Sequence, residues 1–401
     1  MGGLVASLAS LLIVTAPAAQ PATRSALLEG QRAAKAAALH PLEPPKLQRI
    51  LFRMEDEYLV QRVLNAPRGA FVWFGGLPTG SGLAAGPAYR YTGQAATTTI
   101  WGTLSTHRYW EIGGTLAFPR LASGRAFAEV ALRRREFTQE DFFGLGPAST
   151  PDTEANFALR ETTVSATAGV APAWWLRASG TVEYRSPRPG PGRDPDEPSV
   201  EALFPDLPGF TPAEPVDYVR VGARVALNAT GRPFGSPLGG LHAVGYDRYA
   251  DLGPGIFSFN RWEADLRQYV PVAGLTRTLA LRAHYVSLVP DAGHDVPFYL
   301  QPTLGGPDSL RGLAAYRLRD RNALLLQSEY RWDVNAFVGG VLFYETGSVA
   351  RRPRDFRIKE FTQDYGAGVR FGFLTTVSLR IEAVFGAGEG TVFMFRFGNV
   401  F

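Results

Sequence analysis

From about residue 69 onward, the chain alternates apolar and polar residues in segments of roughly ten to fourteen residues. In segment 376–386 every second residue is apolar, and the residues between them include Ser378, Arg380 and Glu382. Segments 216–228, 261–270 and 276–289 show the same pattern. Because successive side chains of a strand point to opposite faces, the pattern predicts strands that each have one apolar and one polar face.

Strands of this kind can build two architectures. In a sandwich the apolar faces meet in a core, whereas in a transmembrane barrel they face lipid and the polar faces line a lumen. The segments are longer than the roughly five or six residues usual for strands and are about long enough for a tilted membrane crossing. Aromatic residues also stand near the ends of the apolar faces, as they do at membrane interfaces: Trp110, Phe118, Trp174, Tyr184, Tyr330 and Trp332. Both features favour the barrel.

Sixteen such segments can be counted, and bacterial barrels have an even number of strands. The predicted strands are 69–76, 82–91, 95–106, 108–119, 124–136, 155–169, 172–186, 216–229, 237–250, 256–270, 276–289, 321–333, 336–346, 362–372, 376–386 and 390–401. We therefore predict an all-β fold, a 16-stranded antiparallel transmembrane β-barrel over residues 69–401. Its first strand is the weakest, because three of its residues are glycines.

The connections between these strands differ in length. Four long ones, 137–154, 187–215, 290–320 and 347–361, alternate with short turns. Membrane barrels have short periplasmic turns and long external loops, so the long set is expected outside. The proline-rich segment 186–215 is expected to be an exposed, mobile loop.

The first residues of the chain predict export. An apolar run at 4–14 is too short to span a bilayer, and the Ala-Pro-Ala-Ala stretch at 16–19 matches a cleavage site, so residues 1–19 are predicted to be a signal peptide. Residues 20–68 contain two helix-like stretches separated by prolines. We expect them to form a short helical periplasmic arm or plug segment, and the protein to reach the bacterial outer membrane through the periplasm.

Composition excludes several classes of function. The chain has no cysteine, which rules out a disulfide framework, zinc fingers and thiol catalysis. All but three of its 41 Lys and Arg residues are Arg, and they are scattered, unlike the basic patches of nucleic-acid-binding proteins. The five His residues lack metal-ligand spacing, and no glycine-rich stretch joins a strand to a helix, so no metal and no cofactor are expected. The run 133–135, three arginines, is expected at a strand end near lipid headgroups, with a functional anion patch as the alternative.

The longest connection, 290–320, carries the most distinctive residues. Its turn Gly305-Gly306-Pro307 precedes Ser309-Leu310-Arg311-Gly312, and the strand after next contains Phe343-Tyr344-Glu345-Thr346-Gly347. This pairing resembles the outer-membrane surface-antigen superfamily, which includes the barrel-assembly proteins BamA and TamA and the two-partner-secretion translocators. Members of that superfamily are 16-stranded barrels whose sixth external loop folds into the lumen. The loop carries an Arg-Gly-aromatic tip, and its Arg meets the acidic residue of a Phe-x-Asp-x-Gly motif on the thirteenth strand.

The resemblance implies two groups of site residues. The loop tip would be Arg311, Gly312 and Leu313, and the acidic motif that anchors it would be Phe343, Glu345 and Gly347. Leu313 stands where the family has an aromatic residue, and Glu345 stands where it has Asp. A guanidinium held by a carboxylate in a partly desolvated lumen is a charge-assisted, potentially bidentate pair. Segment 141–146, Asp-Phe-Phe-Gly-Leu-Gly, and a C-terminal strand signal with Phe397 and Phe401 resemble the superfamily as well.

The function implied by the resemblance is membrane insertion or translocation of proteins or lipids, with the first and last strands as a weak seam. The expected partners are the outer-membrane lipid bilayer and substrate proteins or lipids, with no nucleic acid, and the expected state is a monomer that is not an enzyme. Relatives carry periplasmic POTRA modules that receive clients, and the segment before residue 69 is too short for one, so client recognition is not carried over. The alternatives are a passive, porin-like channel with loop 290–320 as its constriction and a barrel hydrolase using His284 or His294.

Overall fold

The computed structural model describes Ala66, residues 68–210, 216–230, 238–272, 276–335, 338–373 and 377–397, and Phe401. The predicted signal peptide and helical arm lie outside these residues, apart from Ala66 and Arg68. No helix among the described residues is long and apolar enough to cross a membrane.

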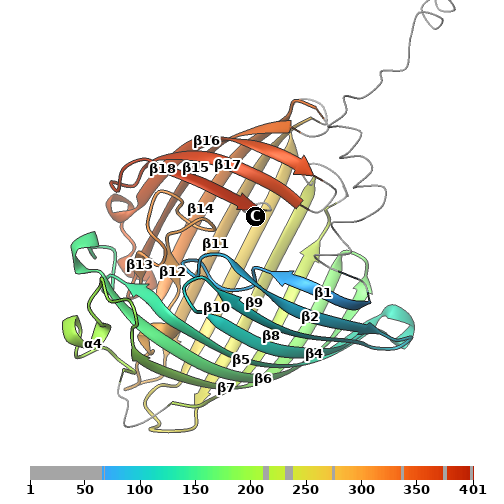
Figure 1. The fold of residues 1–401 in the computed structure, drawn as a ribbon, viewed down its shortest axis with the longest axis horizontal. Helices are drawn as coiled ribbons and strands as arrows, with labels where there is room; N and C mark the ends of the chain where they lie inside the picture. Colours follow the sequence, from blue (N-terminus) through green and yellow to red (C-terminus); the bar gives the residue numbers. More distant parts are fainter. Residues whose placement is uncertain are drawn as a thin grey trace, which may run out of the picture. The chain divides into compact units, whose positions relative to one another are not determined.

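Sixteen strands form one antiparallel sheet in which each strand lies beside the next in chain order (Figure 1). The first eight are β1 (Gly69–Phe74), β2 (Ala84–Thr92), β3 (Thr97–Ser105), β4 (Trp110–Leu121), β5 (Ala126–Phe142), β6 (Ala155–Ala173), β7 (Leu176–Pro191) and β8 (Tyr218–Asn228). The others are β9 (Gly239–Asp251), β10 (Phe259–Pro271), β11 (Arg277–Pro290), β14 (Asn322–Asp333), β15 (Val338–Ala350), β16 (Thr362–Phe373), β17 (Val377–Gly386) and β18 (Val392–Phe397). The predicted all-β fold with sixteen antiparallel strands is confirmed.

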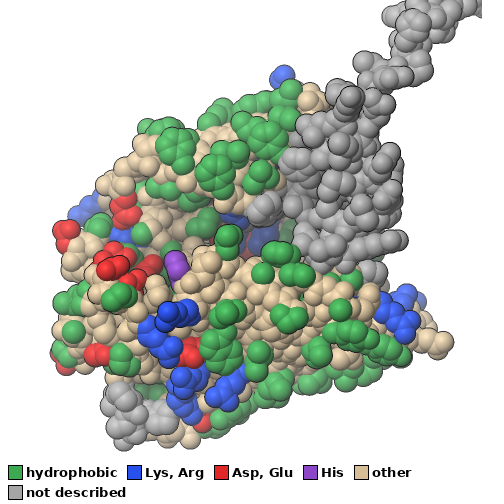
Figure 2. All heavy atoms as spheres, viewed as in Figure 1, with side chains coloured by type: hydrophobic (Ala, Val, Ile, Leu, Met, Phe, Trp, Pro, Cys, Tyr) green, Lys and Arg blue, Asp and Glu red, His purple; other side chains and the backbone are tan. Residues whose placement is uncertain are grey.

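The two faces of the sheet have opposite character. Outward side chains are apolar and exposed, among them Val130, Leu132, Val182, Val221, Val244, Leu342, Phe393 and Phe395. Inward side chains include many buried charges, such as Glu161, Asp265, Glu329, Arg331, Arg380 and Glu382. Figure 2 shows hydrophobic side chains spread over the outward surface of the strands. A sandwich would bury the apolar faces, so this arrangement is that of a membrane barrel, whose apolar face meets lipid.

The two edge strands differ from a closed barrel. β1 pairs with β2 and β18 pairs with β17, and among the described residues no ladder joins β1 to β18. The sequence predicted closure, so the open edge is a correction. Both edge strands have only six residues. β1 is shortened because Gly75 and Gly76, at φ 72° and 82°, leave the extended conformation directly after Phe74.

The described part of the proline-rich segment, residues 186–210, contains regular structure that the sequence did not predict. β7 continues through Pro191, and a short helix, α4 (Val200–Leu203), follows with Val200 fully buried. Beyond Arg185, β7 has β6 on one side and no β8 residue on the other. Prolines occupy the alternate positions 187, 189 and 191, whose backbone nitrogens face the unpaired side of the strand. Because no neighbouring strand accepts a hydrogen bond there, the lack of an N–H group costs no ladder bond.

The connection between β11 and β14 runs along the inside of the sheet. It contains a small sheet of β12 (Thr303–Leu304) and β13 (Leu318–Arg319) and contributes to three buried apolar clusters. Phe298 packs with Phe142 and Phe157 of β5 and β6, and Val296 packs with residues of β8 to β10. Leucines 304, 310, 313 and 318 pack against β14 and β15. The connection is thus held to the inner wall at three places.

Candidate functional site

The loop that carries Arg311 is shaped by glycines and closed by a small hairpin. Gly305 and Gly306 adopt φ of 118° and 86°, and a Cβ on Gly305 would lie 2.2 Å from the carbonyl oxygen of Ala314. Only glycine fits that position. At the base of the loop, Thr303 pairs with Arg319 and Leu304 with Leu318. This geometry directs the loop tip toward the inner faces of β14, β15 and β17.

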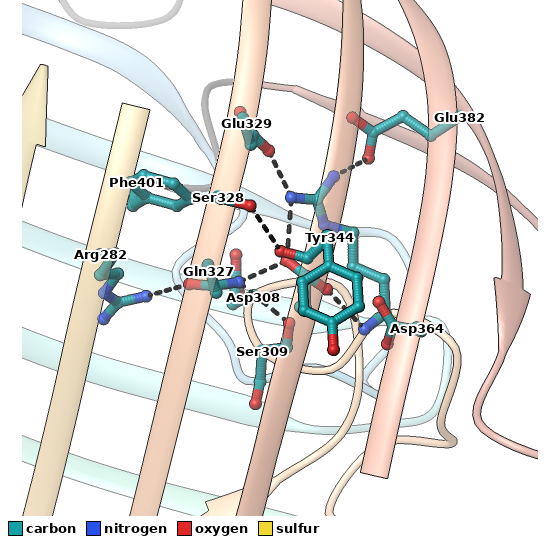
Figure 3. A network of polar contacts seen from close by, with 12 residues as sticks. Arg282, Asp308, Ser309, Gln327, Ser328, Glu329, Tyr344, Asp364, Glu382 and Phe401 are labelled. Atoms are coloured by element: carbon teal, nitrogen blue, oxygen red, sulfur yellow. Dashed lines mark hydrogen bonds and ion pairs between the residues drawn. The ribbon is translucent and has the colours of Figure 1, made fainter. Parts of the chain in front are cut away.

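Arg311 lies at the centre of a buried network of charges (Figure 3). One terminal nitrogen of its guanidinium lies 2.9 Å from Glu345 Oε1 and also donates to Glu329. The other donates to Glu382 Oε2 at 3.0 Å. The backbone N–H of Arg311 donates to the second oxygen of Glu345 at 3.1 Å. Three strands therefore each supply one carboxylate to a single guanidinium, and Figure 3 labels two of the three, Glu329 and Glu382.

The carboxylates around Arg311 are shared with two further arginines. Glu329 accepts from Arg331 Nε at 2.7 Å and from Arg380 at 2.9 Å, and Arg380 also donates to Glu382 at 2.8 Å. All of these side chains are at most 1% exposed. Burying an ion pair carries a large desolvation cost unless each charge has several hydrogen bonds. Three arginines and three glutamates in alternation meet that condition, and the pairs are of the strong, charge-assisted type.

Gly312 lies close against β16, where an added Cβ would be tightly packed. Its N–H donates to Asp364 Oδ2 at 2.9 Å, and a Cβ would lie 3.0 Å from the Cβ atoms of Asp364 and Ala387. Asp364 faces Glu345 in the ladder between β15 and β16. The two consecutive N–H groups of Arg311 and Gly312 are therefore received by two neighbouring carboxyl groups.

The other expected site residues surround this contact. The guanidinium of Arg311 lies 3.8 Å above the ring of Phe343, a cation–π arrangement. Gly347 lies beneath the hairpin, where a Cβ would lie 3.1 Å from a methyl carbon of Leu304. Leu313, which replaces an aromatic residue of the family, is buried in the leucine cluster of the loop.

A second set of contacts joins the same loop to other connections. Arg319 donates to Glu140 at 2.7 Å, and its backbone oxygen accepts from the N–H of Gly146, in the Asp-Phe-Phe-Gly-Leu-Gly segment, at 2.8 Å. Arg317 donates to Glu389, in the turn before β18, at 2.8 Å and to the backbone oxygen of Ser149 at 2.6 Å. The segment 141–146 thus lies against the base of the loop.

Of the expected C-terminal strand signal, Phe397 ends the last strand and Phe401 lies beyond it. β18 ends at Phe397, while Phe401 is buried against Tyr269 and Ala280 and its backbone oxygen accepts from Arg331 at 3.2 Å. The sequence pattern had placed Phe401 on the strand with Phe393 and Phe395, whose rings are exposed. The burial of Phe401 beside β10 and β11 is a correction to that pattern.

Three members of the network were not singled out from the sequence, Asp364, Glu329 and Arg331, and two more, Arg380 and Glu382, were noted only as polar-face residues. The available signal was the alternation itself, because each occupies the polar phase of its strand. The histidines considered for a hydrolase make ordinary polar contacts instead. His284 lies 3.1 Å from Glu263, and the His294 ring accepts from the N–H of Ser258.

Comparison with solved structures places this fold among known barrels. BamA from Haemophilus ducreyi lacking POTRA domains 1–3 matches with a TM-score of 0.59 and 14% identity, over 82% of this chain and 68% of that one. CdiB from Escherichia coli matches with a TM-score of 0.53 and 14% identity, over 82% of this chain and 60% of that one. CdiB from Acinetobacter baumannii matches with a TM-score of 0.50 and 11% identity, over 79% and 56%. This chain thus spans less than two thirds of either CdiB.

Sequence comparison gives the family. No curated protein matches the chain. The model of the Omp85 superfamily domain matches residues 133–397, from β5 to the end of β18, and so includes Arg311 and every carboxylate that contacts it. The resemblance to the barrel-assembly superfamily drawn from the sequence is thereby confirmed. The chain is an outer-membrane β-barrel protein that belongs to the Omp85 superfamily.

Proposed function

We propose that this protein inserts or translocates proteins or lipids at the outer membrane, and that the edge between β1 and β18 is the place of passage. The observation that carries the proposal is that, among the residues that the structure describes, each edge strand pairs on one side only. An unpaired strand edge presents N–H and C=O groups that can pair with an incoming strand. Two such edges, both short, form a seam that no described ladder closes, so an incoming strand can pair there without first breaking one.

The loop that carries Arg311 contacts both sides of this seam. On one side Arg396 of β18 donates to Asp308 at 2.6 Å and to the backbone oxygen of Pro307. On the other, the hydroxyl of Tyr316 donates to the backbone oxygen of Thr79, between β1 and β2, at 2.9 Å. We infer that the Arg311–Glu345 contact fixes the loop to the wall and so fixes the spacing of the two edges.

The same proposal includes the setting of the protein. Residues 1–19 serve as a signal peptide for export through the periplasm, residues 20–68 form a periplasmic arm or plug, and residues 69–401 form the barrel. The protein acts as a monomer on substrate proteins or lipids, and it has no catalytic role.

The absence of cysteine from the chain makes the seam directly testable. Cysteines at Val72 on β1 and Phe395 on β18, both outward and exposed, can be treated with bismaleimides of increasing length until a cross-link forms. The matched control is a cysteine pair at Ala383 and Phe393, which are ladder partners in β17 and β18. The protein is reconstituted in liposomes and given an unfolded outer-membrane barrel as client, whose insertion is followed by protease protection. Joining the seam should abolish insertion and joining the control pair should not. Insertion at an unchanged rate through a joined seam would refute the proposal.

A passive channel is the second candidate, and the position of the loop favours it. The connection 290–320 touches the inner wall at β5, at β8 to β10 and at β14 to β15, so it narrows any pore through the sheet. On this reading Arg311→Ala raises single-channel conductance in a planar bilayer and leaves client insertion unchanged. A silent recording from the wild-type protein and from the variant excludes it.

A further inference from the structure

The arginine run at 133–135 is divided between the two faces of β5. Arg133 lies over the ring of Trp101 and Arg135 donates to Glu161, both on the inner side. Arg134 points outward in the phase of Val130 and Leu132, whose side chains are exposed. An arginine on the lipid-facing side of a barrel is costly at mid-membrane and is tolerated only near an interface.

Arg134 is one of four arginines on this outward surface. Glu136, Arg160 and Arg188 occupy one row across β5, β6 and β7, as direct ladder partners. Trp110 continues the row on β4, and its ring N–H donates to Glu136 at 3.0 Å. Arg193, just past the end of β7, also donates to Glu136. Figure 2 shows basic side chains gathered over β5 to β7 toward α4.

These arginines outnumber the carboxylates that form ion pairs with them. Arg160 and Arg193 share Glu136, at 3.1 and 2.6 Å, and Arg188 pairs with Asp217 at 2.7 Å. Arg134 has no ion pair among the described residues. Four arginines thus have two carboxylates as ion-pair partners, and Arg160 and Arg188 lie directly opposite each other on neighbouring strands. Like charges in that relation repel, and an anion between them would remove the repulsion.

The depth of the patch matches a lipid headgroup. Below the arginines, the same strands expose Ile112, Leu132, Val164 and Val182 to lipid. From Ala126 at the start of β5 to Arg134 the strand covers about 27 Å at roughly 3.4 Å per residue, or about 21 Å of height at a tilt near 40°. An apolar band of roughly 25 Å therefore ends at the level of the patch. The patch lies toward the end of the strands from which the long connections leave.

We propose that Arg134, Arg160, Arg188 and Arg193 bind the phosphate groups of a phosphorylated glycolipid in the outer leaflet. Guanidinium groups match phosphate oxygens in bidentate pairs, and Trp110 with Tyr184 supplies the aromatic edge usual at this depth. The acyl chains of the same lipid lie along the exposed aliphatic side chains below. The half-exposed side chains of Arg160 and Arg188, 49% and 40%, leave room for the ligand.

The test uses the full-length protein in detergent micelles and bis-phosphorylated lipid A as the probe, with native mass spectrometry as the readout. The triple variant Arg134→Gln/Arg160→Gln/Arg188→Gln leaves Arg193 to neutralise Glu136. The matched control, Arg351→Gln/Arg352→Gln/Arg354→Gln, removes the same charge from the exposed loop between β15 and β16. Heat-modifiability on a gel shows that each variant is folded, and Arg134→Gln alone serves if the triple variant does not fold, because it breaks no ion pair.

We expect the patch variant to bind lipid A at least tenfold more weakly than wild type, and the control to bind as wild type does. The single Arg134→Gln change should weaken binding about threefold. Lipid A stripped of its phosphates should bind wild type and patch variant equally. Three results would each overturn the proposal. The patch and control variants could lose affinity for lipid A to the same extent, the wild type could bind phosphatidylglycerol as tightly as lipid A, or the patch variant could bind lipid A as the wild type does.

Discussion

Replacing Arg311 by methionine should release the loop tip from the inner wall. Methionine keeps much of the side-chain volume, so the change removes charge and hydrogen bonds rather than opening a cavity. Without the guanidinium, Glu329 keeps Arg331 and Arg380, and Glu382 keeps Arg380. Glu345 keeps two neutral donors, the side-chain amide of Gln327 and the backbone N–H of residue 311, but no guanidinium. One buried carboxylate is therefore left without a counter-charge.

The free-energy cost of Arg311→Met follows from the number of carboxylates left without a counter-charge. Removing one partner of a buried ion pair costs about 3–5 kcal/mol, mainly because the other charge stays buried and unpaired. Only one of the three carboxylates, Glu345, loses its sole guanidinium. We therefore expect the free-energy cost of the substitution to lie at the lower end of this range, about 3 kcal/mol. If the loop opens locally, amide exchange at Leu310–Gly312 should accelerate by roughly 150-fold, at 1.36 kcal/mol per factor of ten.

Hydrogen exchange followed by mass spectrometry on the reconstituted protein measures this directly. The matched control is Arg248→Ala, which breaks another Arg–carboxylate pair at the start of the same connection. Arg248 contacts Asp291 through two bonds of 2.6 Å, but both side chains are about one-third exposed, so the expected cost is at most about 1 kcal/mol. Arg311→Met/Glu345→Gln should recover more than half of the lost protection. Exchange at the loop tip within threefold of wild type in Arg311→Met would refute the reasoning.

The remaining predictions are read from urea unfolding followed by tryptophan fluorescence. Gly312→Ala forces a methyl group against two Cβ atoms at 3.0 Å and should cost about 1–3 kcal/mol, whereas Gly190→Ala, with nothing within 4 Å, should be neutral. Phe298→Ala should cost about 3–5 kcal/mol because its ring is fully buried, and Phe393→Ala, 71% exposed, should cost far less; similar losses in both would contradict the assignment of faces. Burial and three nearby carboxylates raise the pKa of the Glu154 carboxyl. Its ionisation therefore opposes folding as pH rises, so Glu154→Gln should raise the unfolding midpoint at pH 8 and leave it unchanged at pH 3.

Much of the fold could be read from the sequence because one period dominates it. A two-residue alternation marks the strand, its length and its two faces at once, and all sixteen strands in the structure begin within four residues of a predicted segment. The alternation does not predict whether the first and last strands of the sheet pair. Pairing of β1 with β18 would depend on backbone geometry and not on which side chains are apolar. The extension of β7 to Pro191 was missed for a related reason: proline is tolerated where one edge is unpaired, and that edge is a property of the neighbouring strand.

In the candidate site, too, some contacts could be predicted from the sequence and others could not. Arg311 and Glu345 were paired through short motifs, and in the structure they lie 2.9 Å apart. Glu329 and Glu382 belong to no such motif. They lie on β14 and β17, which stand on either side of β15, the strand of Glu345, and of β16, and this order of strands brings them to Arg311. Their polar phase could be predicted, but their height on the wall depends on the stagger between strands. A list of polar-phase residues therefore narrows the partners without choosing among them.

The polar character of the inner wall explains why the loop is attached to it through ion pairs. In this fold the apolar faces of the strands are turned to lipid, so the surface offered to an internal loop is mostly polar. Among the described residues, the loop has apolar packing around Phe298, around Val296 and where it brings its own leucines. Between these places, attachment depends on ion pairs that are strong while water is excluded and weak once it enters. A loop attached in this way can detach when the wall spreads, because the separated charges are then hydrated by the lumen. Opening of the β1–β18 edge and release of Arg311 should therefore occur together, and a cross-link at the edge should slow exchange at the loop tip.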